Sequence, residues 1–495
     1  SKPVDSYSWR DPGLRHFLPQ TRAMGVTWSE EQAVREHAYY LWQEGIGQDD
    51  VARYYLAHDC FRWLQQLEEY GQGRDLTDSQ ESCAVMALAD DIVQSGVSIE
   101  CVKQMVYPRP AHYPATLVSA VGLADSATQM RACEHPFHFT VVHAMFKERD
   151  RMSVPSRNCP EGQDFVRMKV AQMEWLFHGY APEGTTWSYI ACDDGCPQKS
   201  GRLMEEIIKK EGYTNVSVVY LQTAIDERTP PFDRLETTND SKKGGAVLYG
   251  LDSAVKMGPT DGRKHIVAYV DADLSADLGL CGLLTHPILQ KGKMVSVGVR
   301  YGEPGSFLVL PHGADGYPAS VWNNTDCHKM IFRHFARNIL MPPLRTIKDT
   351  QCAFKAFEAD RLPEIVSQMD AFGPTVDMEL LLVATEVYAG EDAFEPVPLC
   401  FVEDKEGSTM SSSGNRALQN FHKMLKDMVQ IHDKFFLASD AFSAEDKAFI
   451  QFFRGLTFDR YQSLIAGITA RLGPKPPEPL ETRFTLVELE SMAAV

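Results

Sequence analysis

The sequence predicts an α/β protein in which a mostly parallel sheet is flanked by helices and extended by helical segments at both ends. Residues 131–410 alternate between short apolar, β-branched runs and amphipathic stretches, which is the pattern of a parallel sheet covered on both faces. Residues 1–130 and 411–495 instead carry apolar residues at spacings of three to four, as amphipathic helices do. We therefore expect a helical N-terminal domain, a central α/β domain and a helical C-terminal extension with these boundaries.

Length, charge and composition narrow the classes of function. A chain of 495 residues with 44% hydrophobic and 23% charged residues is long enough for two or three globular domains. A net charge of −18 argues against a nucleic-acid-binding protein and against a protein held on anionic lipid. No run of 18 apolar residues is present, and the eleven cysteines lack paired metal-ligand spacing. We expect a soluble, cytoplasmic protein without an integral membrane segment.

The two flanks are expected to be helical for most of their length. Helices are predicted within residues 29–70, 78–104 and 416–470, and the proline-rich run at 474–479 is expected to start an extended tail. A structural cap or the surface of a homodimer is the commonest role for such flanks, and acceptor binding is the alternative. The polar stretch 403–415 is expected to be either a lid or a linker.

Five strands are expected in the central part, because five runs are predominantly apolar and rich in β-branched residues. They cover residues 139–146, 187–192, 216–221, 266–270 and 294–299, and helices are expected around 163–178, 199–211, 244–256 and 278–289. Sheets of this kind bind ligands at the carboxyl ends of their parallel strands. Polar residues directly after a strand are therefore the first candidates for a functional site.

The strongest candidate is Asp271-Ala272-Asp273, directly after the expected strand 266–270. Two carboxylates one residue apart at a strand end can both turn toward one cation. Mg²⁺ or Mn²⁺ takes oxygen ligands and bridges readily to a diphosphate, whose charge the metal would neutralise as a nucleotide departs. In an ordinary loop such a pair is more often a solvated turn, but its place after a buried strand favours the metal site.

Two further motifs suit a nucleotide. Asp193 and Asp194 follow the strand 187–192, and their carboxylates can accept hydrogen bonds from a base or from ribose hydroxyls, although an Asp-Gly turn into the next helix is the alternative. The stretch 241–247 (SKKGGAV) is basic and glycine-bearing and opens a helix. Backbone amides and Lys243 at such a helix start suit a diphosphate, although the spacing is not that of a Walker loop.

Candidates for a general base come later in the chain. Asp377 and Glu379 begin an apolar run that is expected to form a buried helix. Burial raises the pKa of a carboxyl group toward the range that a general base needs. The alternative is an acid placed at a helix N-terminus because the helix dipole favours it there. Asp349, in the motif 349–355 (DTQCAFK), is a second candidate.

Taken in order, these motifs resemble family 2 glycosyltransferases of the GT-A fold, in particular the dolichyl-phosphate glucosyl- and mannosyltransferase branch. The resemblance covers roughly residues 138–410 and neither flank. The motifs that carry it are Glu148, Asp193-Asp194-Gly195, Lys243-Gly244-Gly245-Ala246-Val247, Asp271-Ala272-Asp273, Gly298-Val299-Arg300-Tyr301, Asp349-Thr350-Gln351-Cys352, Asp377-Met378-Glu379 and Glu406-Gly407-Ser408.

The resemblance implies an inverting, metal-dependent transfer from a UDP- or GDP-sugar, and it implies a role for each matching residue. Glu148 and Asp193 would hold the nucleoside, and Lys243 would lie near the nucleotide. Asp271 and Asp273 would bind Mg²⁺ or Mn²⁺, and Arg300 would lie near the diphosphate or the acceptor. Asp349 and Gln351 would line the reaction centre, and Asp377 or Glu379 would be the base.

The chain departs from the family at two points. The usual Pro-x-Tyr-Asn-Glu entry is replaced by residues 143–148 (HAMFKE), which keep only Glu148. Membrane helices or anchors are absent, so a soluble small-molecule or glycan acceptor is expected, with a polyprenyl phosphate at a membrane surface as the alternative. The amphipathic stretch 321–340, with Lys329, Arg333, His334 and Arg337, would suit an anionic acceptor or a membrane surface, although a packed helix is the commoner outcome.

Two other functions are compatible with the same pattern. A sugar nucleotidyltransferase also pairs a nucleotide-binding sheet with metal carboxylates, but it usually has a glycine- and arginine-rich loop after the first strand. Residues 143–158 (HAMFKERDRMSVPSRN) are basic and contain no glycine there. A non-catalytic sugar-nucleotide-binding protein is the other alternative, and the retained carboxylate pair argues against it.

Overall fold

The computed structural model describes residues 30–43, 45–47, 50–67, 70, 75–108, 113–301, 303–309, 331–332, 335, 339–344, 346–402, 415–437, 439, 442–472 and 484–494. Several predictions fall outside these ranges. They are the proline-rich tail, the lid or linker at 403–414 with its Glu406-Gly407-Ser408 motif, and most of the amphipathic stretch 321–340, including Lys329, Arg333, His334 and Arg337.

Within the described residues, seven strands form one sheet in the order β3-β2-β1-β4-β7-β5-β8. Only β7 runs antiparallel to its neighbours β4 and β5, so the predicted α/β class with a mostly parallel sheet is confirmed. The strands are β1 (His138–Met145), β2 (Thr186–Asp193), β3 (Val216–Tyr220), β4 (His265–Val270), β5 (Val295–Val299), β7 (Phe354–Glu358) and β8 (Phe394–Pro398), beside a second sheet of β6 (Phe307–Val309) and β9 (Cys400–Val402).

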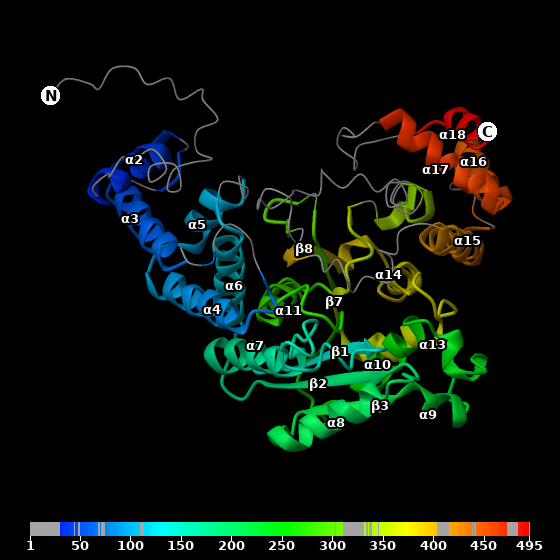
Figure 1. Cartoon of the computed structure of the whole chain (residues 1–495), viewed down its shortest axis with the longest axis horizontal. Coiled ribbons are helices and arrows are strands. Elements are labelled where there is room, and N and C mark those ends of the chain that lie inside the picture. The colour runs from blue at the N-terminus through cyan, green and yellow to red at the C-terminus, as the bar shows by residue number, and fades with distance from the viewer. Residues whose placement is uncertain are drawn as a thin grey trace.

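Helices cover both faces of the large sheet (Figure 1). In the central part they are α7 (Phe165–Tyr180), α8 (Ser200–Glu211), α9 (Leu221–Asp226), α10 (Gly244–Lys256), α11 (Cys281–Gln290), α13 (Leu362–Ser367) and α14 (Val376–Val387). Successive strand residues point to opposite faces. Phe139 and Val141 accordingly join the core beneath α7, α8 and α11, whereas Val142 and Tyr269 join the core beneath α10 and α14.

The N-terminal helices share the first of these cores. They are α2 (Glu30–Gln43), α3 (Asp50–Gln66), α4 (Ser79–Gln94), α5 (Ile99–Val106) and α6 (Ala115–Arg131). Almost every residue of α6 is buried, because α6 packs against α4 and α5 on one side and against α7 and α11 on the other. Near the predicted boundary at residue 130, α6 ends at Arg131 and β1 begins at His138, and one apolar core continues across this point.

The C-terminal helices pack against the second core. They are α15 (Asn415–Phe436), α16 (Ala444–Gly455), α17 (Phe458–Leu472) and α18 (Leu486–Met492), and their buried apolar residues cluster with those of α10, α13 and α14. Both flanks are therefore extensions of the hydrophobic layers around the central sheet. Among the described helices, none is long and apolar enough to cross a membrane.

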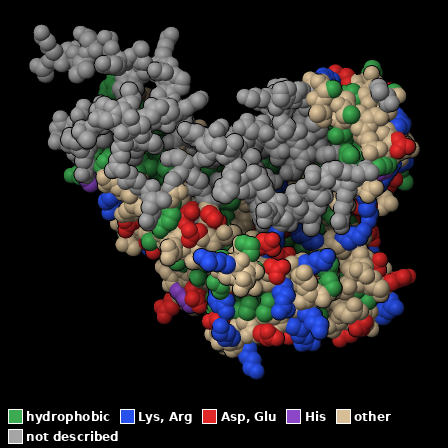
Figure 2. Space-filling model, in the orientation of Figure 1, with side chains coloured by type: hydrophobic (Ala, Val, Ile, Leu, Met, Phe, Trp, Pro, Cys, Tyr) green, Lys and Arg blue, Asp and Glu red, His purple; other side chains and the backbone are tan. Residues whose placement is uncertain are grey.

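Charge is mixed on the surface around the lower strands. In the view of Figure 2, Lys and Arg side chains lie among Asp and Glu side chains over the part of the molecule that holds β2, β3 and α8. Ion pairs of this part of the chain include Arg202 with Glu205 and Arg167 with Glu211. Interspersed charge of this kind differs from the continuous basic face that nucleic-acid-binding proteins present.

Candidate functional site

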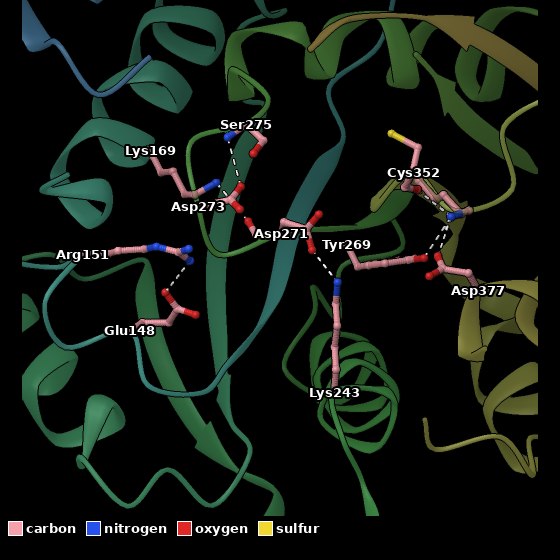
Figure 3. Close-up of polar contacts among 11 residues, drawn as sticks. Glu148, Arg151, Lys169, Lys243, Tyr269, Asp271, Asp273, Ser275, Cys352 and Asp377 are labelled. Carbon is pink, nitrogen blue, oxygen red and sulfur yellow. Dashed lines mark hydrogen bonds and ion pairs between the residues drawn. The ribbon is translucent and has the colours of Figure 1, made fainter. Parts of the chain in front are cut away.

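The predicted site residues converge at one edge of the large sheet. Parallel strands β1, β2, β4 and β5 end at this edge, and the antiparallel strand β7 begins there. This arrangement brings together the side chains that follow the parallel strands and those that precede β7. The N-termini of α10 and α14 lie at the same place (Figure 3). The residues at this edge are Glu148, Asp193, Asp194, Lys243, Asp271, Asp273, Arg300, Asp349, Gln351 and Asp377.

Asp271 and Asp273 form the centre of the site and differ in charge environment. Lys243 Nζ donates to Asp271 Oδ1 at 2.5 Å, whereas Asp273 Oδ1 accepts the backbone N–H of Ser275 at 3.0 Å (Figure 3). Burial acts against ionisation of Asp271, but the charge and hydrogen bond of Lys243, together with the charges of Arg300 and Lys169, outweigh it and lower the pKa of this carboxyl group. Burial and the adjacent Asp271 raise the pKa of Asp273, so a cation beside Asp273 would stabilise its ionised form.

The residues present fit a divalent metal that is shared with a substrate. Mg²⁺ is usually held by one or two carboxylates, with substrate phosphates and water completing its ligands. The described residues contain no group of three or more His, Cys, Asp or Glu side chains placed to hold a metal. Asp271 and Asp273 therefore suit a metal that arrives with a diphosphate, rather than one caged by protein ligands alone.

Lys169 is a second cation at this centre. It lies on α7, is almost fully buried, and donates from Nζ to the backbone oxygen of Asp271 at 3.2 Å. Burial lowers the pKa of Lys169, while the charges of Asp273 and Asp271 act in the opposite direction. The loop that carries the carboxylate pair is thus held from one side by Lys169 and from the other by Lys243.

The turn before α10 presents Lys243 to the site. Lys242 and Lys243 have φ of 43° and 88°, a strained conformation for residues with side chains. Asp194 Oδ2 stabilises it by accepting the backbone N–H of Lys243 at 2.8 Å. A Cβ at Gly244 would lie 2.5 Å from the backbone of Phe372, so only glycine fits there. Asp194 therefore orients the turn that was predicted to bind a diphosphate.

Asp193 and Asp194 have different surroundings. The carboxylate of Asp193 accepts the backbone N–H groups of Cys196 and Gly201, each at 2.8 Å. The second oxygen of Asp194, Oδ1, is buried without a hydrogen-bond partner among the described residues. Burial raises the pKa of Asp194 to about 6. Asp193 thus stabilises the start of α8, and Asp194 is the residue of the pair with an acceptor to offer to a ligand.

Glu148 lies within electrostatic reach of the carboxylate pair. Arg151 Nη1 donates to Glu148 Oε2 at 3.0 Å (Figure 3), and the backbone N–H of Glu148 donates to Ser200 Oγ at 3.0 Å. Burial raises the pKa of Glu148, and Asp273 and Asp271 add to this increase. A nucleoside held by Glu148 would therefore lie close to a metal at Asp271 and Asp273.

Arg300 and Asp349 form a two-point ion pair. Arg300 donates from Nε to Asp349 Oδ2 at 2.7 Å and from Nη2 to Asp349 Oδ1 at 3.0 Å. Asp349 is fully buried, and the Arg300 guanidinium lies over the ring of Phe401. This geometry makes Asp349 the residue that orients Arg300. Gln351 Nε2 is a buried donor without a partner among the described residues, so Gln351 has a hydrogen bond to offer to a ligand.

Replacing Asp349 with asparagine is expected to lower the free energy of unfolding by about 2–3 kcal/mol. This is below the usual cost of removing one partner of a buried pair, because Arg300 keeps some contact with solvent. The measurement is a urea denaturation curve. The exposed pair of Asp261 and Arg263 provides the control, since Asp261→Asn should change stability much less than Asp349→Asn does. Equal losses of stability in Asp349→Asn and Asp261→Asn would contradict the assignment of Asp349 as the buried partner of Arg300.

Of the three candidates for the base, Asp349 is bound through both oxygens by Arg300. The other two, Asp377 and Glu379, are separated by the fold. Asp377 Oδ1 accepts Lys355 Nζ at 2.6 Å inside the site. Both oxygens of Glu379 are occupied elsewhere, because Oε2 accepts the backbone N–H groups of Asp370 and Ala371 and Oε1 accepts Lys434 Nζ of α15 at 2.6 Å. Glu379 therefore connects α14 to the C-terminal helices, and Asp377 is the better candidate for a base.

Lys169, Tyr269 and Lys355 belong to the site, through contacts with Asp271, Lys355 and Asp377 respectively, and were not predicted from the sequence. Lys169 lies in an amphipathic helix, where a lysine usually faces solvent. Lys355 interrupts the apolar run AFKAF at residues 353–357, and a charged residue inside such a run was the available signal, because charges are almost never fully buried unless they are paired.

Comparison with known proteins adds no family. No protein-family model matches the chain, and no curated protein sequence matches it.

Proposed function

We propose that this protein is an inverting, metal-dependent glycosyltransferase of the GT-A fold that takes its sugar from a UDP- or GDP-sugar. The acceptor would be a small molecule or a glycan. The observation that carries the proposal is the convergence of Asp271, Asp273, Lys243 and Asp377 at the edge where the parallel strands end. The mostly parallel sheet with helices on both faces is compatible with this fold.

In the proposed reaction the acceptor oxygen attacks the anomeric carbon as the bond from that carbon to the diphosphate breaks. Mg²⁺ or Mn²⁺ held by Asp271 and Asp273 would supply Lewis-acid stabilisation of the charge on the diphosphate. Lys243 and the N-terminal amides of α10 bind the same phosphates. These contacts accelerate the reaction only where they strengthen as negative charge develops on the leaving group.

Asp377 removes the proton from the acceptor hydroxyl. One of its oxygens is bound to Lys355, and the side chain is 8% exposed, which leaves the second oxygen to meet an acceptor. Arg300, held by Asp349, lies at the end of β5 beside the carboxylate pair and contributes to the low pKa of Asp271. Its position suits contact with the diphosphate or with an anionic acceptor.

Product analysis tests the proposal. The full-length protein is incubated with Mn²⁺ and, separately, with UDP-glucose or GDP-mannose, and the released nucleotide is identified. Release of the nucleoside diphosphate, accelerated by an added acceptor, is the expected result. In a separate incubation with a nucleoside triphosphate and a sugar 1-phosphate, formation of the nucleotide sugar with release of pyrophosphate would instead identify a nucleotidyltransferase. Tight binding of these donors without turnover would identify a non-catalytic sugar-nucleotide-binding protein.

A further inference from the structure

Lys355 is a fully buried lysine at the centre of the sheet. It lies on β7, the strand between β4 and β5, and is paired in register with Tyr269 on one side and Val297 on the other. A lysine at such a position costs stability unless its ammonium group is paired and hydrogen-bonded. The proposed transfer reaction, as described above, makes no use of it.

The three hydrogen bonds of Lys355 account for its burial. Nζ donates to the backbone oxygen of Cys352 at 2.6 Å, to Asp377 Oδ1 at 2.6 Å and to the hydroxyl of Tyr269 at 3.0 Å. An ammonium group has three protons to donate, so this arrangement satisfies the charged form completely. The carboxylate that it contacts is the one assigned as the base.

We propose that Lys355 is a positioning residue that keeps Asp377 ionised and oriented to accept the proton of the acceptor. The proposal rests on the proposed function. When the sugar is transferred, the acceptor proton moves to the oxygen of Asp377 that is not bound to Lys355. The acceptor oxygen bonds to the anomeric carbon, and the electron pair of the broken bond leaves with the diphosphate. Lys355 transfers no proton in this step.

Burial and charge act against each other at this pair. Burial raises the pKa of Asp377 and lowers the pKa of Lys355. Either group alone would therefore tend to be neutral in this environment, and the 2.6 Å contact between them opposes that tendency. Removing the Lys355 ammonium group should therefore raise the pKa of Asp377 further, because the nearest positive charge is lost and burial still acts.

The other groups around the pair are already engaged or neutral. They are Lys243 at the start of α10, Arg300 and Asp349 at the ends of β5 and β7, Cys352 and Tyr269. Lys243 is paired with Asp271, but its charge also lowers the pKa of Asp377, and Arg300 is paired with Asp349. Burial raises the pKa of the Cys352 thiol to about 12, so it is uncharged at neutral pH. Lys355 is the cation in direct contact with Asp377.

The test is the pH at which Asp377 becomes protonated, in the wild type and in Lys355→Met. Difference infrared titration of the full-length protein follows the carboxylic C=O band, which is assigned to Asp377 by its loss in Asp377→Asn. We expect this band to persist to a pH one to three units higher in Lys355→Met. The acid limb of kcat should move by the same amount, with activity recovered at high pH. A purely structural role would lower kcat equally at every pH.

Two further variants keep the result interpretable. Tyr269→Phe removes one acceptor from Lys355 but keeps the ring, so it should move the band in the same direction by a smaller amount, even if Lys355→Met does not fold. Lys426→Met removes a lysine of α15 that binds backbone oxygens away from the site, and should leave the band unmoved.

The two proposals fail in different ways. An Asp377 band at the same pH in the wild type, Lys355→Met and Tyr269→Phe would overturn the role of Lys355, whatever the activity. A wild type that never transfers sugar, with the band shifted as expected in Lys355→Met, would overturn the proposed function and leave the charge control of Asp377 by Lys355 in place.

Discussion

Replacing Asp273 with alanine is expected to lower the rate of nucleoside diphosphate release by ~10²-fold or more, which is the usual cost of removing one electrostatic stabiliser of a transition state. The reason is that Asp273 and Asp271 are the carboxylates placed to hold a metal beside the diphosphate. Asp271→Ala should have an effect of the same order, and it also leaves Lys243 without its ion-pair partner. The measurement is the initial rate at saturating Mn²⁺ and donor.

Asp261→Ala is the matched control for this substitution. Asp261 lies just before β4, at the end of the strand away from the site, and pairs with Arg263 at the surface. It should leave the rate unchanged. If Asp273→Ala kept the wild-type rate and the wild-type dependence on Mn²⁺, the carboxylate pair would be an ordinary turn and the metal site would be refuted.

Asp377→Asn is expected to lower transfer to a hydroxyl acceptor by ~10²- to 10⁴-fold while leaving donor binding intact, because the amide cannot take up the acceptor proton. The substitution keeps the size of the side chain, and its oxygen can still accept the hydrogen bond from Lys355. Transfer rates at saturating donor and acceptor provide the measurement, with donor affinity measured separately.

The wild-type rate should also depend on pH in a defined direction. Burial raises the pKa of Asp377 to about 7, and only the ionised carboxylate can act as a base. Activity should therefore be present above pH 7 and should be lost as the pH falls through 7, and this acid limb should disappear in Asp377→Asn.

Glu386→Gln is the control for Asp377→Asn, because Glu386 lies on the exposed side of the same helix. It should not change the rate. A mild effect of Asp377→Asn would contradict the role of Asp377 as a base. It would favour an acceptor that is already ionised, such as a polyprenyl phosphate, which needs no strong base.

The strands and the carboxylates that follow them could be predicted from local sequence. The five expected strands lie within two residues of β1 to β5, because apolar runs between amphipathic helices encode buried parallel strands directly. Since the carboxyl ends of parallel strands meet at one edge, the order of the motifs was enough to bring Asp271 and Asp273 to the edge where Glu148 lies.

The position of β7 could not be predicted in this way. Its place between β4 and β5, antiparallel to both, depends on pairing between segments far apart in the chain. That pairing brings Asp349, Gln351 and Lys355 to the site. The contact of Lys355 with Asp377 has the same long-range origin, so a charged residue in an apolar run was the only local sign of it.

The division of roles between neighbouring carboxylates could not be predicted from the sequence either. Adjacent residues at a strand end point to opposite sides, so Asp193 binds the start of α8 while Asp194 binds the turn before α10. Residues two apart on a helix face different directions, so Asp377 points into the site while Glu379 points to α15. Each pair was visible in the sequence, but its division of roles depends on which neighbour packs on each side.

The most direct test of the central claim is the binding of UDP and GDP, each with and without Mn²⁺, to the wild type and to Asp273→Ala by calorimetry. We expect tight, metal-dependent binding of one of the two nucleotides and its loss in Asp273→Ala. That result would place the metal at the carboxylate pair and name the class of donor. Absence of metal-dependent binding of either nucleotide to the wild type would contradict the glycosyltransferase proposal.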